Sequence, residues 1–190
     1  MPRIQAETLP EHRLLVFERV FGAFSALMGE QSYDAITMAQ LAQRAGLGRT
    51  AIYHHFHDKE AVVVAFAGHE TARYVARLSE RLAVADTPSE QLRIYVRSHL
   101  DSGEEFHMGL GPQLYGVLPA SSLGEIREHV AAVEQVLAEI LVAGRDSGEF
   151  VVDDLEATMR LVHACLSPRH VPPETIEAFV LRAVGAAGSE

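Results

Sequence analysis

The chain has 190 residues, 48% of them hydrophobic, and a formal net charge of −10, a composition that excludes an intrinsically disordered protein. No apolar run reaches the roughly 20 residues that cross a bilayer, and no signal-peptide hydrophobic region opens the chain. The single cysteine, Cys165, excludes an internal disulfide framework. We therefore expect a cytoplasmic protein that makes no membrane contact.

The acidity is unevenly distributed along the chain. Residues 1–60 contain six Lys or Arg against seven Asp or Glu, whereas residues 61–190 contain ten against nineteen. Docking to a polyanion depends on local charge more than on the whole-chain sum. The first third of the chain is therefore compatible with nucleic-acid binding.

The first predicted helix covers about residues 11–30. Its apolar side chains recur at three- and four-residue steps, which is the period of one helical face. This face comprises Leu14, Phe17, Phe21, Phe24 and Met28.

Residues 37–60 predict two short helices joined by a tight turn. Thr37 and Gln40 have the spacing of a capping box, which opens the first helix. Gly46 suits the left-handed position just after a helix end. The second helix should bury Ile52 and Phe56, and Asp58 can cap the helix that follows. This is the helix-turn-helix arrangement, whose second helix fits the major groove of DNA.

The rest of the chain also indicates helices, so the predicted fold class is all-α. Glycine and proline interrupt 107–124, and Gly144 to Gly148 predicts a turn. Helices are expected at about 58–84, 88–104, 113–117, from Ser121 or Ser122 onward, from a cap at Asp153 or Asp154 to Cys165, and at 174–185.

The motif resembles that of the tetracycline-repressor (TetR/AcrR) family of bacterial transcriptional regulators. The similarity is specific over about residues 11–66 and architectural beyond it. It is carried by Gly29 to Thr37, Ala45-Gly46-Leu47, Ile52-Tyr53-His54-His55-Phe56 and Asp58-Lys59-Glu60. The resemblance implies a helix-turn-helix DNA-binding domain at 1–57 and a helical effector-binding and dimerisation domain at 58–190. Gly48 and Ala51 lack hydroxyl groups that the family often has there.

The resemblance also implies which residues bind double-stranded DNA. Arg49, Thr50 and His54 are expected to read bases, although Arg49 could instead contact phosphate. Tyr53 and Lys59 are expected to contact phosphates, although an isolated lysine would more simply be a solvated surface residue. The full predicted DNA-binding set is Thr37, Arg44, Arg49, Thr50, Tyr53, His54 and Lys59.

A small-molecule effector site is expected among the helices of the second domain. The alternative interpretation is that these side chains, which recur at helical spacing, form ordinary core. The predicted site comprises Phe66, His69, Tyr95, His99, His107 and Tyr115.

The last two helices are too apolar for a free surface, so they either pack on the domain core or form a two-fold interface. The second interpretation resembles the dimerisation mode of the family. The predicted interface comprises Met159, Val162, Leu166, Ile176, Phe179, Val180 and Ala183.

The sequence has no zinc-ligand spacing, nucleophile elbow or phosphate-binding glycine loop, so we expect no metal, no cofactor and no enzymatic activity. The alternative is a transition-metal site at His99 and His107 with His69. The predicted function is a homodimeric one-component regulator, a repressor released from a palindromic operator by a small-molecule effector. The alternative is a DNA-binding regulator of the same fold without such an effector, controlled by a protein partner or constitutive. A different class of protein, a helical enzyme or carrier in which the helix-turn-helix motif is incidental, is the third interpretation.

Overall fold

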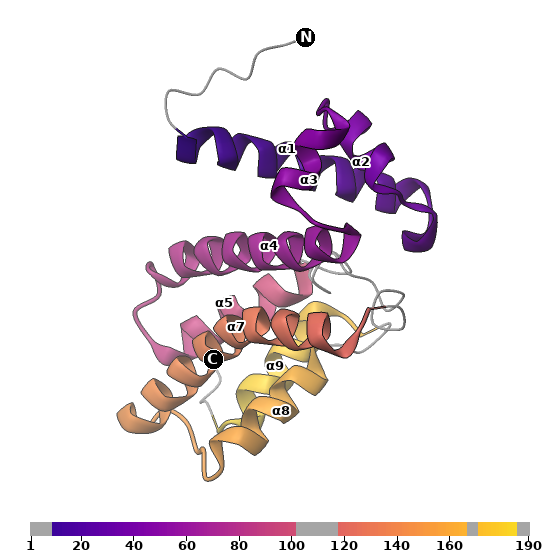
Figure 1. The fold of residues 1–190 in the computed structure, drawn as a ribbon. Helices are drawn as coiled ribbons and strands as arrows, with labels where there is room; N and C mark the ends of the chain where they lie inside the picture. Colours follow the sequence, from indigo (N-terminus) through magenta and orange to yellow (C-terminus); the bar gives the residue numbers. More distant parts are fainter. Residues whose placement is uncertain (1–8, 102–117, 167–170, 186–190) are drawn as a thin grey trace. The chain divides into compact units, whose positions relative to one another are not determined.

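The computed structural model describes residues 9–101, 118–166 and 171–185, and within these residues the regular elements are all helical (Figure 1). None of their helices combines the length and apolarity needed to cross a membrane. The elements are α1 (Leu9–Glu30), the 3-10 turn η1 (Tyr33–Ala35), α2 (Met38–Arg44), α3 (Arg49–His55), α4 (Lys59–Leu82), α5 (Pro88–Asp101), α7 (Ala120–Ser147), α8 (Leu155–Cys165) and α9 (Pro173–Ala183).

The chain packs as two compact units. Of the described residues, the N-terminal unit contains 9–69 and 118–126, and the C-terminal unit contains the remainder. Helices α4 and α7 each run from one unit into the other, after His69 and Ile126 respectively. The boundary expected between residues 57 and 58 separates a DNA-binding domain from an effector-binding and dimerisation domain, and it stays a prediction.

The core of the N-terminal unit forms between α1 and the helix-turn-helix pair. Val20 and Phe24 of α1 are fully buried, as are Leu41 of α2 and Ile52 of α3. The prediction that Leu14 belongs to the inner face of α1 is wrong, because 64% of this residue is exposed. The buried face of α1 also contains Val16, Val20 and Leu27. Each of these residues comes one position before a member of the predicted apolar face.

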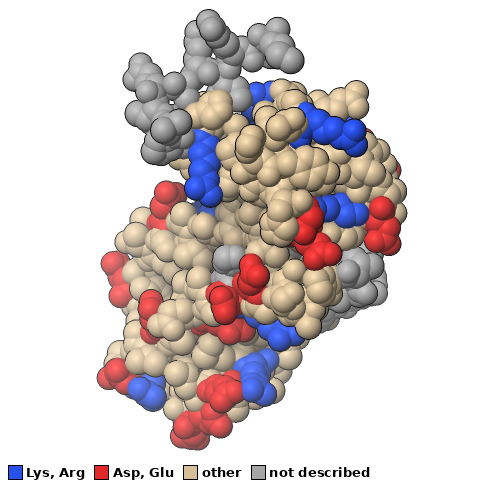
Figure 2. All heavy atoms as spheres, viewed as in Figure 1, with Lys and Arg blue, Asp and Glu red and all other residues tan. Residues whose placement is uncertain are grey.

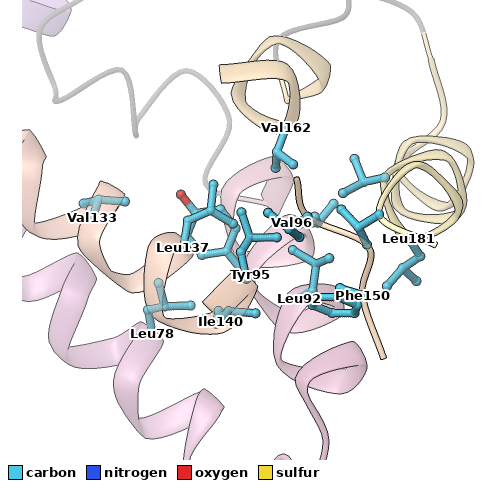
Figure 3. Close-up of a cluster of buried hydrophobic side chains, with 14 of the residues drawn as sticks. Leu78, Leu92, Tyr95, Val96, Val133, Leu137, Ile140, Phe150, Val162 and Leu181 are labelled. Atoms are coloured by element: carbon cyan, nitrogen blue, oxygen red, sulfur yellow. The ribbon is translucent and has the colours of Figure 1, made fainter. Parts of the chain in front are cut away.

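The core of the C-terminal unit draws apolar side chains from five helices and from the segment after α7 (Figure 3). Figure 3 shows Tyr95 between residues of α5, α7 and α8, and none of its surface is exposed. Other members are Leu78, Leu92, Val96, Leu137, Ile140, Phe150, Val162 and Leu181.

The end of α7 differs from the prediction. Gly144 does not begin a turn but remains helical, and α7 continues to Ser147. The turn falls at Gly148, whose φ of +81° lies in the left-handed region. Gly144 has a packing role: a Cβ atom there would stand 2.0 Å from the Phe150 ring, and the Phe150 amide donates to the Gly144 carbonyl at 2.9 Å. A glycine inside a helix can thus mark close packing as well as a turn.

Candidate nucleic-acid interface

The capping box predicted at the start of α2 is present. The Gln40 amide donates to the Thr37 hydroxyl oxygen at 3.2 Å, and the Thr37 amide donates to the Gln40 side-chain oxygen at 2.8 Å. Two amides that would otherwise lack partners are thereby satisfied. Thr37 is thus first a structural residue, and DNA contact by its exposed edge stays a prediction.

The turn between α2 and α3 requires a glycine. Gly46 has a φ of +64°, its amide donates to the Gln43 carbonyl at 3.1 Å, and the Leu47 amide donates to the Ala42 carbonyl at 2.8 Å. These are the two hydrogen bonds of a Schellman motif. The Arg19 guanidinium of α1 also donates to the Gly46 carbonyl at 3.0 Å, which holds the turn against α1. The left-handed glycine predicted from the sequence is confirmed.

Helix α3 has one buried face and one exposed face. Ile52 is fully buried and Phe56, which ends the helix, is 2% exposed. Arg49, Thr50, Tyr53 and His54 are exposed, as the amphipathic spacing predicts, but His55, which the same spacing places on the exposed side, is half-buried beside Phe17. The Phe56 ring lies 4.8 Å from Phe17 and 6.2 Å from Phe21 of α1, and with the buried Ile52 it holds the polar face of α3 outward.

Lys59 at the start of α4 is less free than a surface lysine. Its ammonium donates to the Tyr33 carbonyl at 2.7 Å and lies 4.0 Å from the centre of the Tyr33 ring. Partial burial lowers the pKa of Lys59, while the carboxylates of Asp34 and Glu60 oppose that shift. Burial also raises the pKa of Tyr33 to about 12. An ammonium has three N–H donors, so a phosphate contact stays open beside this anchoring role.

The other cap at this junction is confirmed. The Asp58 carboxylate accepts the Ala61 amide at 2.8 Å and therefore caps α4. Arg44 makes two hydrogen bonds to Glu30, at 2.5 and 2.8 Å, and this ion pair lowers the pKa of the Glu30 carboxyl. Arg44 would have to share or break these bonds to contact DNA.

Two of the predicted effector residues come together in the C-terminal unit. The Tyr95 and His99 rings of α5 lie 5.4 Å apart. Tyr95 forms a hydrogen bond of 3.0 Å with His163 of α8, and Tyr74 of α4 forms one of 3.3 Å with His99. Burial raises the pKa values of both tyrosines and lowers that of His163. The result is a group of two phenols and two imidazoles on three helices.

Tyr74 and His163 of this group were missed by the sequence reasoning. Both occupy inward helical positions beside other apolar residues, so a polar side chain at a core position was the available signal. Phe66 and His69 lie in the N-terminal unit, where the Phe66 ring is 5.1 Å from Phe24 and the His69 ring 4.9 Å from Phe21. His107 and Tyr115 fall outside the described residues.

The predicted dimer residues divide between the core and the surface of α8 and α9. Val162, Ile176 and Val180 are buried in the core of the C-terminal unit, and Met159 and Leu166 pack partly against it. Phe179 is 53% exposed, and Ala183, one turn further along α9, is also exposed. Leu161 of α8, which the sequence reasoning omitted, is 68% exposed.

Two further observations concern charge and metal ions. Asp and Glu side chains are spread over the C-terminal unit on the face drawn in Figure 2, in keeping with the acidic second part of the sequence. Within the described residues, no three His, Cys, Asp or Glu side chains gather as a metal site would require.

Comparison with known proteins identifies both parts of the chain. The family model for bacterial regulatory proteins of the tetR family matches residues 23–66. A second model, for a tetracyclin repressor-like C-terminal domain, matches residues 88–178. The HTH-type transcriptional repressor Rv1474c of Mycobacterium tuberculosis is 34% identical over 76 residues, which is 40% of this chain and 38% of that protein. The HTH-type transcriptional repressor AcnR of Corynebacterium efficiens is 39% identical over 51 residues, or 27% of either chain.

The fold is shared with solved structures across both units. Reduced NemR of E. coli has a TM-score of 0.75 at 18% identity, over 91% of this chain and 100% of its own. FadR of Bacillus subtilis, solved with stearoyl-CoA, has a TM-score of 0.66 at 17% identity, over 90% and 88%. A putative transcriptional regulator of Saccharomonospora viridis, solved with choline, has a TM-score of 0.70 at 14% identity, over 93% and 96%. With a helix-turn-helix held by the Gly46 turn and matches in both parts of the sequence, the chain belongs to the TetR family of bacterial DNA-binding transcription regulators.

Proposed function

We propose that this protein is a homodimeric transcriptional repressor that binds a palindromic operator and is released from it by a small-molecule effector. The observation that carries the DNA-binding part is the two-sided α3, whose apolar side chains are buried while Arg49, Thr50, Tyr53 and His54 are exposed. A short helix held in this way can enter the major groove without reorganisation.

The exposed residues divide by chemistry into base-reading and phosphate-binding groups. Arg49 opens α3 and can present two donors to a guanine edge, a contact worth roughly 1–3 kcal/mol against the wrong base. Thr50 and His54 lie on the same face and complete the base-reading group. Tyr53 and Lys59 contact phosphates, which position the protein without selecting sequence. Thr37 and Arg44 extend the interface from α2 in this proposal.

Dimerisation is assigned to the outer faces of α8 and α9. Leu161, Phe179 and Ala183 are apolar and exposed, whereas the neighbouring Val162 and Val180 are committed to the core. A second copy that covered this surface would remove it from water and fix the spacing of two recognition helices. Two copies then add their binding energies on a palindrome.

The effector site is assigned to the C-terminal unit, around Tyr95 and His99 with Tyr74 and His163. These side chains combine aromatic surface with hydroxyl and ring N–H groups, as small-molecule sites commonly do. The stearoyl-CoA and choline found in two neighbours of the same fold support a ligand-responsive role. Tyr74 lies on α4, which begins at Lys59 in the DNA-binding unit, so α4 is the proposed mechanical link. An effector that prefers the released conformation lowers operator affinity by its differential affinity.

Selection of bound fragments from genomic DNA, followed by titration of purified protein on the enriched duplex, tests the DNA-binding proposal. We expect a symmetric consensus and two chains per site. Arg49→Ala should relax preference at one symmetric pair of positions, and Lys59→Ala should reduce the slope of log affinity against log salt by roughly one. If the selection enriches no sequence, the DNA-binding proposal is contradicted. If Arg49→Ala selects the same consensus as the unmodified protein, Arg49 contacts phosphate instead of a base.

Sedimentation of surface variants tests the dimer proposal separately. Leu161→Arg and Phe179→Arg should yield folded monomers that no longer bind the operator. Val84→Arg is a matched control, because Val84 is 80% exposed and follows the end of α4, outside α8 and α9. Dimers that persist in both helix variants would place the interface elsewhere.

A further inference from the structure

Several side chains that can carry positive charge gather where α1 begins and α3 ends. The Arg13 guanidinium carbon lies 5.2 Å from the centre of the Phe17 ring, and the His55 ring lies 5.8 Å from the same ring, edge-on. Phe17 thus brings a cation of α1 and an imidazole of α3 to one place. His12 is half-buried on α1, and His54 is exposed on α3.

The electrostatics of this group disfavour an added proton in the free protein. Partial burial lowers the pKa of His55, and the positive charges of Arg13, His12 and His54 lower it further. The acidic residues of the same segments are Glu11 and Glu18, both exposed on α1, and Asp58, which accepts the Ala61 amide and lies 3.1 Å from His57. The ammonium of Lys59 is held by the Tyr33 carbonyl.

A DNA backbone at this place would reverse that balance. A phosphate would bring a negative charge next to the imidazole, and an opposite charge within hydrogen-bonding reach favours the protonated imidazole. We propose that His12, Arg13 and His55 form a proton-dependent phosphate-binding patch that extends the DNA interface from α3 onto α1, beside the base-reading His54. This proposal rests on the DNA-binding function proposed above. It adds the start of α1 to the DNA interface, names phosphate as the group bound there, and makes DNA affinity depend on pH.

The sign of the pH response follows from linkage. Because the bound state holds the proton more tightly than the free state, binding takes up protons and affinity rises as pH falls. The slope of log affinity against pH equals the number of protons taken up. One histidine per subunit contributes at most about two protons per dimer, so the slope of log affinity against pH should lie between zero and about −2. We expect affinity to fall by about tenfold between pH 6 and pH 8. A phosphate contact carries no sequence information, so a scrambled duplex should show the same slope.

The test uses the full chain, the duplex enriched by selection and a scrambled duplex of the same length, titrated at constant ionic strength between about pH 6 and pH 8. His55→Gln should flatten the slope on both duplexes. His55→Arg, permanently charged, should also flatten it, and should bind at the upper pH at least as tightly as the unmodified protein. His57→Gln is the matched control, because His57 is a neighbouring histidine that pairs with Asp58, and it should keep the full slope.

The outcomes separate the patch from the proposed function. Equal slopes for the unmodified protein, His55→Gln and His12→Gln would overturn the patch. Loss of selective binding with a retained His55-dependent slope on the scrambled duplex would overturn the operator function alone. Melting curves at both ends of the pH range establish that each variant is folded. If His55→Gln fails to fold, His12→Gln on α1 decides the same question.

Discussion

Glu177 should be among the most important residues for the stability of the C-terminal unit. Its carboxylate, on α9, is only 8% exposed, yet it carries a charge. Arg93 of α5 donates to one of its oxygens at 2.9 Å, and Arg97, one turn later, donates to the other. The pair of arginines therefore ties α9 to α5 through a single buried side chain.

The expected cost of Glu177→Ala can be estimated from these contacts. Each hydrogen bond to a charged group contributes roughly 1.5–3 kcal/mol, and breaking a buried pair by removing one partner costs about 3–5 kcal/mol. Arg93 and Arg97 are 33% and 54% exposed, so water can solvate them again in the variant. We therefore expect the free energy of unfolding to fall by about 2–4 kcal/mol, somewhat less than the cost of breaking a fully buried pair.

Urea unfolding followed by far-ultraviolet circular dichroism measures this loss, since the chain has no tryptophan. Protein concentration is kept constant because dimerisation would shift the midpoint. Glu156→Ala is the matched control: Glu156 pairs with Arg160 at 2.5 Å on α8, but both are more than three-quarters exposed. That pair should contribute only about 0.3–0.5 kcal/mol. A Glu177→Ala variant as stable as Glu156→Ala would refute the argument that burial makes the difference.

Three further predictions concern glycine packing and pH. Gly144→Ala should lower the free energy of unfolding by about 1–3 kcal/mol, because its Cβ would overlap Phe150. Gly124→Ala is the control in the same helix: it has open space around it and should be neutral or stabilising by up to about 1 kcal/mol. Gly46→Ala should cost about 1–2 kcal/mol in the N-terminal unit because of its positive φ. Urea midpoints should separate it from Gly22→Ala, which lies inside α1 with open space around it and should be neutral or stabilising. Burial lowers the folded-state pKa of His163 below its ordinary 6.5, so the stability of the C-terminal unit should fall as pH drops below about 6.5. In urea titrations across that window, His163→Gln should lose less stability than the unmodified protein, and equal losses would contradict the assignment.

Local signals allowed the N-terminal unit to be predicted closely. The capping box at Thr37, the left-handed Gly46, the inward Ile52 and the cap at Asp58 each depend on a few neighbouring residues, so the sequence contains the whole cause. The prediction for Leu14 was wrong because an apolar residue at helical spacing does not always lie on the packed face of its helix. Which of two adjacent stripes is buried depends on the helix that lies against it.

Long-range contacts explain what the sequence could not predict in the C-terminal unit. Gly144 has the composition signal of a turn, and only the later Phe150, folded back on the helix, makes it a packing glycine. Tyr95 was recognised as inward-facing, but its partner His163 lies 68 residues away on α8. Pairing between helices so distant in sequence requires the topology, not the periodicity.

Lys59 joins these two kinds of inference. Its position beside the Asp58 cap marks it as a phosphate ligand by local reasoning, while its bond to the Tyr33 carbonyl gives it a structural role that spacing does not reveal. The two roles support each other physically. An ammonium fixed by one carbonyl loses less side-chain entropy when a phosphate engages its remaining donors, because much of that entropy is already lost on folding. The anchor also joins η1 to the start of α4, so the first turn of α4 would already be fixed in the free protein if it contacts the DNA backbone as proposed.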